Sequence, residues 1–101
     1  MPAARDLQLH HLLALRDQYR SEADVMARTL GDLREEVERC QRQRMLAQLW
    51  GEPVDPLHRR ELTEVQDEHD RVAMELAHIR LAVLGVQDEI ATAGPGERLS
   101  A

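Results

Sequence analysis

Aromatic side chains are nearly missing from this chain: phenylalanine is absent, and Tyr19 and Trp50 are the only tyrosine and tryptophan. This scarcity argues against a globular core built on large rings. A chain of 101 residues forms one domain at most and buries only about 60–65% of the surface that it exposes when unfolded. Charged residues make up 32% of it, which is typical of helices packed through aliphatic side chains.

Lysine is also absent, and there is a single cysteine. The formal net charge of −6 argues against nucleic-acid binding, which needs a basic face. Cys40 alone can form no intrachain disulfide and has no metal-ligand spacing around it. No apolar run approaches the roughly 18–20 residues of a membrane span, and the N-terminus lacks a signal-peptide pattern. We therefore expect no membrane partner and a cytoplasmic location.

Two segments carry apolar residues that recur alternately three and four positions apart. Such a sustained heptad pattern predicts an all-α fold, an antiparallel two-helix coiled-coil hairpin that assembles into a four-helix bundle by dimerisation. The two segments contribute different members to this predicted hairpin seam. They are Leu12, Tyr19, Met26, Leu30, Leu33, Val37 and Cys40 from the first, and Leu62, Val65, His69, Val72, Leu76, Ile79, Val83, Val86 and Ile90 from the second.

The predicted organisation is an N-terminal arm at 1–5, a helical hairpin at 6–93 and a disordered tail at 94–101. Within the hairpin we expect helix 6–50, turn 51–56 and helix 57–93. Gly51 suits the left-handed stop of the first helix, and Asp55 and Pro56 suit the start of the second. A turn centred near Pro53 to Asp55 sets Cys40 opposite His69.

The same register predicts unequal charge along the two edges of the hairpin. One edge would carry Glu22, Glu36, Glu68, Glu75 and Glu89, and the other Arg20, Arg34 and Arg80. The charged edges can be read in two ways. Either they dock a partner or a second copy of the chain, or they form only a solvated rim, since exposed ion pairs contribute about 0–1 kcal/mol.

A second apolar stripe lies on the other side of the second helix from the seam. Met74, Ala77, Leu81 and Leu84 follow one another three and four residues apart. A two-helix hairpin cannot cover both faces of a helix, so the stripe indicates an association surface. The alternative is that the N-terminal segment around Leu7, Leu13 and Leu15 folds over it.

Few residues offer chemistry. Of the five histidines only His69 is placed near Cys40, and two ligands make no zinc site, so we interpret this pair as a polar layer that fixes the register. Glu75 and His78 match the Glu-x-x-His pair of ferritin-like bundles but lack the inward glutamates of the facing helices. We predict no catalytic residue, no cofactor and no metal site.

Two families share features with the chain. Leu12 to Arg16, Arg44 and Arg60-Glu61 resemble the active-site spacing of the all-helical chorismate mutases, although that family's Ile-Asp pair and mid-helix arginine have no counterpart. The length, the acidity and Trp50-Gly51 at the turn resemble the Trp-x-Gly hairpins of type VII secretion, whose C-terminal Tyr-x-x-x-Asp/Glu signal is missing. The first resemblance implies an enzyme, and the second a secreted heterodimer partner.

The pattern as a whole favours a non-catalytic interaction module. It would serve as a scaffold, adaptor, chaperone or secretion-apparatus accessory that binds itself, most simply as a homodimer, or another helical protein.

Overall fold

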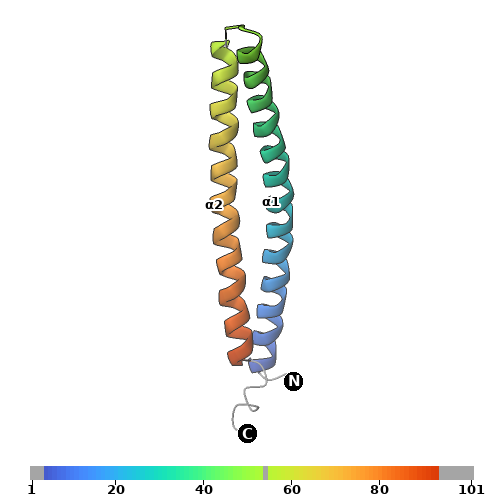
Figure 1. Cartoon of the computed structure of the whole chain (residues 1–101). Coiled ribbons are helices and arrows are strands. Elements are labelled where there is room, and N and C mark those ends of the chain that lie inside the picture. The colour runs from blue at the N-terminus through green and yellow to red at the C-terminus, as the bar shows by residue number, and fades with distance from the viewer. Residues whose placement is uncertain (1–3, 54, 94–101) are drawn as a thin grey trace. The chain divides into compact units, whose positions relative to one another are not determined.

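A computed structural model describes residues 4–53 and 55–93 of the chain. Two α-helices contain nearly all of them: α1 is Ala4–Leu49 and α2 is Pro56–Ala93. The helices pack against each other in an antiparallel hairpin, and no strand occurs within the described ranges (Figure 1). The predicted all-α helical hairpin is therefore confirmed.

Each helix contributes to two compact units, which we describe separately. The terminal half contains residues 4–25 of α1 and 76–93 of α2, and the turn half contains residues 26–75. The helix bounds differ slightly from those expected. Ala4 and Arg5, assigned to an N-terminal arm, are helical, and α1 ends at Leu49 instead of residue 50. Pro56, assigned to the turn, opens α2. The rest of the arm and the tail at 94–101 lie outside the described residues.

The end of α1 is set by Gly51, whose backbone has a φ of 71°. Glycine reaches this left-handed region without the clash that a β-carbon would cause. The amide of Glu52 donates to the carbonyl oxygen of Ala47 at 2.8 Å, and the amide of Gly51 donates to that of Gln48 at 3.2 Å. These two bonds form a Schellman motif, which satisfies carbonyls that the helix leaves unpaired and stops it.

The start of α2 is set by Asp55. The amide of Leu57 donates to the Asp55 carboxylate at 3.0 Å, and the amide of Arg59 donates to the Asp55 carbonyl oxygen at 3.2 Å. Asp55 is thus the N-cap, and Pro56 follows at the first helical position, where a missing amide hydrogen does no harm. The stop and the start lie close together in sequence, so the chain must reverse.

The turn half pairs α1 with α2 in a register that differs from the predicted one. His58 Nε2 lies 3.1 Å from the carbonyl oxygen of Cys40, and His58 shares a groove with Arg44. A helix rises about 1.5 Å per residue, so His69 lies about 16 Å farther along α2 than His58. The predicted pairing of Cys40 with His69 is therefore wrong.

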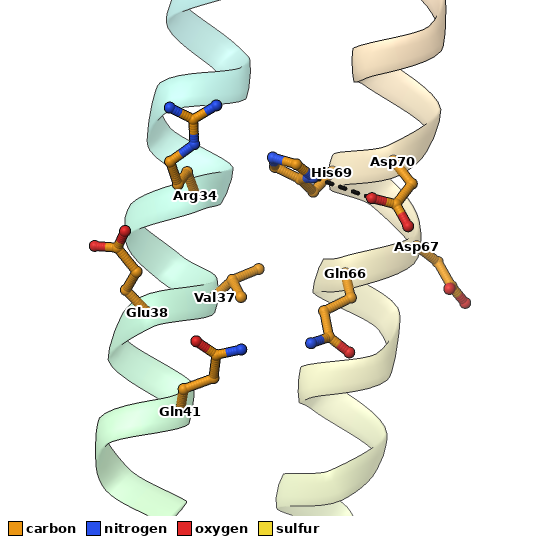
Figure 2. A pocket seen from close by; sticks show the side chains of 8 residues that line it. All are labelled: Arg34, Val37, Glu38, Gln41, Gln66, Asp67, His69 and Asp70. Carbon is orange, nitrogen blue, oxygen red and sulfur yellow. Dashed lines mark hydrogen bonds and ion pairs between the residues drawn. The ribbon is translucent and has the colours of Figure 1, made fainter.

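The observed register follows from the same contacts. Arg44 and His58 lie level with each other. One helical turn farther from the connection, Cys40 of α1 and Leu62 of α2 are therefore level as well, and they are 5% and 6% exposed. One heptad farther on, His69 comes level with Arg34 of α1 (Figure 2). The difference is one heptad. Both helix ends at the turn lie within one residue of their predicted positions, so the error lies in the assumed turn centre near Pro53 to Asp55, whereas the pairing of Cys40 with Leu62 is centred on residue 51.

The terminal half is closed by aliphatic packing. Leu12 of α1 and Leu76 and Val86 of α2 are 3–7% exposed. At the end of α2, Arg5 Nε donates to the carbonyl oxygen of Ala93 at 3.1 Å. The last carbonyls of a helix have no partner within it, so this guanidinium caps α2 from the first turns of α1.

The register can be tested by disulfide trapping, because Cys40 is the only cysteine. Leu62→Cys should form an intrachain disulfide with Cys40 under mild oxidation, since level positions of packed helices allow the roughly 4.4–6.8 Å between Cα atoms that a disulfide needs. His69→Cys is the matched control and should stay reduced. Non-reducing electrophoresis and mass spectrometry distinguish the two, and the opposite result would restore the predicted register.

Candidate functional site

The α2 stripe, defined as Met74, Ala77, Leu81 and Leu84, is open to solvent. Met74 and Leu81 are each 64% exposed and Leu84 is 57% exposed, and Ala77 is exposed as well. The N-terminal segment does not fold over it, because Leu7, Leu13 and Leu15 belong to α1. That alternative is therefore wrong.

The predicted seam residues are the shielded ones. Six are buried: Leu12, Cys40, Leu62, Val72, Leu76 and Val86. The other ten are partly exposed, namely Tyr19, Met26, Leu30, Leu33, Val37, Val65, His69, Ile79, Val83 and Ile90. A single interface between two helices leaves most side chains with one side in solvent, which explains the partial exposure.

A groove of about 460 Å³ lies beside His69 in the turn half (Figure 2). Arg34, Glu38, Asp67 and Asp70 contribute its charged groups. His69 Nδ1 donates to the Asp70 carboxylate at 3.2 Å, and the His69 side chain is 26% exposed. A histidine–aspartate pair needs a nucleophile to act in covalent catalysis, and no serine, threonine or cysteine lines this groove.

The thiol of Cys40 is not available to that pair. Cys40 is buried and level with the first turns of α2, where His58 contacts its carbonyl oxygen instead of its sulfur. Among residues 4–53 and 55–93, no group of three or more His, Cys, Asp and Glu side chains is placed to hold a metal ion. Glu75 is bonded to Arg71 at 2.7 Å and His78 is exposed, so the Glu-x-x-His pair is not assembled either.

Charged side chains form short-range clusters along α2. Arg71 bonds to both Glu68 and Glu75, with Arg71 Nε donating to Glu68 at 3.1 Å. The hydrogen bond to Glu68 and the negative charges of Glu68 and Glu75 raise the pKa of Arg71 above its ordinary value. Two members of the predicted acidic edge are thus neutralised in part by one arginine of their own helix.

The predicted basic edge is mixed as well. Arg34 shares its groove with Glu38, Asp67 and Asp70, and Arg20 and Arg80 share theirs with Asp24. Arg20 and Arg80 do share one edge, as predicted, but carboxylates at positions farther from the seam lie in the same grooves, so the edge is mixed in charge.

A second exposed apolar surface was missed in the sequence. This α1 patch consists of Met45, Leu46, Leu49 and Trp50, which are 55%, 55%, 75% and 78% exposed. It consists of two adjacent pairs one helical turn apart: Leu46 and Leu49 are three residues apart, and Met45 and Leu49 are four, so the pairs lie on one helix face. That signal is present in the sequence, but Trp50 was interpreted there only as a marker of the turn.

Neither helix in the described part of the chain contains a stretch apolar enough to cross a membrane. Comparisons with known protein families, with curated proteins and with solved structures give no match.

Of the residues that resemble chorismate mutases, Arg44, Arg60 and Glu61 are exposed and Arg16 bonds to Asp17 at 3.2 Å. The described residues thus present two exposed apolar surfaces, the α2 stripe and the α1 patch.

Substitutions at two nearby positions of α2 test which face of the helix is packed and which is exposed. Leu76 is 3% exposed and Met74 is 64% exposed. Leu76→Asp should remove several kcal/mol from a total stability of about 5–15 kcal/mol, because a carboxylate would replace a buried aliphatic group. Met74→Asp should leave helicity and the melting temperature nearly unchanged. Circular dichroism measures both, and equal effects of the two substitutions would contradict this assignment of faces.

Proposed function

We propose that this chain is a non-catalytic helical interaction module that binds a second helical chain through the α2 stripe. The observation that carries the proposal is the exposure of Met74, Leu81 and Leu84, at 64%, 64% and 57%. Single exposed aliphatic residues are ordinary, but a contiguous apolar line usually marks a binding surface. Its role would be that of a scaffold, adaptor, chaperone or secretion-apparatus accessory in the cytoplasm.

The spacing of the stripe favours a helix as the partner. Side chains three and four residues apart form the ridge that packs into the groove of another helix, as in a coiled coil. Burying three aliphatic side chains would contribute about 1.5–3 kcal/mol each before the cost of association. The simplest partner is a second copy of the chain. If the stripes of two copies pair with each other, the product is a homodimer and a four-helix bundle.

A secreted hairpin resembling the type VII Trp-x-Gly proteins is the alternative. It is supported by Trp50, which follows the last residue of α1 and lies next to Gly51 in the turn. Immunodetection in culture medium and in cell lysate of the native host distinguishes the two: protein found in intact cells supports the interaction module, and active export supports the alternative. A chorismate-mutase-like enzyme is the less favoured candidate, and an assay of chorismate conversion tests it.

The stripe can be removed without touching the packed face. Wild type should associate at micromolar concentration. Leu81→Glu combined with Leu84→Glu should give monomers, and these should remain helical because both side chains point away from the packed face. Sedimentation equilibrium measures the mass and circular dichroism the helicity.

Leu7→Glu combined with Val25→Glu is the matched control. Both residues are large, apolar and exposed, at 57% and 60%, but lie outside the stripe. This control should associate like wild type. A wild-type chain that sediments as a monomer and recovers no partner from its native host would remove the proposal.

A further inference from the structure

The α2 stripe continues into carboxylates at both ends. Asp67 and Asp70 precede Met74, and Asp88 follows Leu84, at the same alternation of three and four residues. All three aspartates are exposed, and of the described residues only His69 bonds to one of their carboxylates, that of Asp70. A helix that lies along either end of the stripe therefore meets negative charge.

Two copies of the stripe do not suit each other. In an antiparallel pair centred near Ile79, Met74 faces Leu84 and Ala77 faces Leu81, but the same register sets Asp70 of each copy against Asp88 of the other. In a parallel pair each aspartate faces its own equivalent. Like charges that face each other across helices oppose association, so the stripe calls for a different surface on its partner.

The chain itself carries such a surface at the end of α1. The segment Arg39–Trp50 contains three arginines and no carboxylate, a formal charge of +3, whereas Asp67–Asp88 contains five carboxylates and two arginines, a formal charge of −3. Arg39 is paired with Glu36 at 3.5 Å, which offsets part of this charge. Arg42 precedes Met45, Leu46 and Leu49 at helical spacing and forms no ion pair with any described residue, although it shares an exposed groove with acidic side chains. The α1 patch is thus an apolar ridge with a basic end.

We propose that the α1 patch of one chain docks on the α2 stripe of a second copy. This inference rests on the proposed function, since the stripe is one of its two surfaces, and it names the surface that the stripe meets. Apolar side chains would cover apolar side chains, and arginines would lie near aspartates.

The turn argues against a lipid surface as the occupant of the patch. Glu52 and Asp55 are exposed in the connection that follows Trp50. A membrane that attracts arginines is anionic, and it would repel these carboxylates as the patch approached. A neighbouring helix that lies along Met45, Leu46 and Leu49 need not contact the connection at all.

The proposed contact joins two different surfaces. Each copy keeps one unused patch or stripe after the first contact, so association continues along a series of copies or closes into a ring. A contact between two identical stripes would instead stop at the dimer. The order of assembly at rising concentration therefore separates the two arrangements.

Complementation of two association-deficient variants provides a direct test. The patch variant carries Leu46→Glu and Leu49→Glu and keeps its stripe, and the stripe variant carries Leu81→Glu and Leu84→Glu and keeps its patch. Each should be monomeric alone, while an equimolar mixture should form a one-to-one complex that does not grow further. Sedimentation velocity with one variant fluorescently labelled detects the complex, and circular dichroism confirms that both variants stay helical.

Each other outcome overturns the inference. A patch variant that still self-associates while the stripe variant does not would mean that stripes pair with stripes, which keeps the proposed function. Monomeric variants that fail to complement would mean that the two surfaces do not meet. A monomeric wild type would remove the proposed function as well.

Two measurements check the chemistry of the contact. Arg42→Glu should weaken association of the full chain by about tenfold or more at low salt, and much less at high salt, because screening removes the contribution of the charges. Vesicles of phosphatidylserine and phosphatidylcholine test the lipid alternative. Binding that is lost in the patch variant, with self-association unchanged, would assign the patch to a membrane and overturn the inference.

Discussion

The packing of one aliphatic face of α1 on one aliphatic face of α2 is the interaction on which the rest of the structure depends. Two helices share a single interface, and the described ranges 4–53 and 55–93 contain no third element that covers their outward sides. Leu76 is buried and Met74, on the same helix, is 64% exposed. In a larger bundle an apolar residue at an outward position can be core, but in a two-helix hairpin it cannot. This is why the proposed function rests on so short an apolar line.

The fold was predictable from the sequence, whereas its register was not. Heptad spacing fixes which face of each helix is buried, but a shift of seven residues again sets aliphatic side chains against aliphatic side chains. Leu33 can face Leu76 or His69 at little difference in pattern. Only the turn removes this ambiguity. The stop at Gly51 and the cap at Asp55 were both predicted, but the pairing of Cys40 with Leu62 is centred on residue 51 and not near Pro53 to Asp55.

The two candidate surfaces differ in how readily the sequence shows them. Met74, Ala77, Leu81 and Leu84 stand out because the seam of the same helix is regular on both sides of them. The α1 patch consists of two adjacent apolar pairs at a helix end, where the heptad pattern stops and the turn begins. The 75–78% exposure of Leu49 and Trp50 makes it a surface.

Net charge describes this chain poorly, because charge of opposite sign is segregated along it. A total of −6 implies repulsion between copies, yet screening limits each charge to neighbours within about 8 Å at physiological salt. Within that distance the electrostatic energy of a docked helix depends on single residues such as Arg42 or Asp70, and not on the net charge of the chain. Apolar contacts supply most of the affinity of such an interface, and the charges select which surfaces meet. The arrangement of arginines and aspartates around two similar apolar ridges therefore determines whether identical or different surfaces associate.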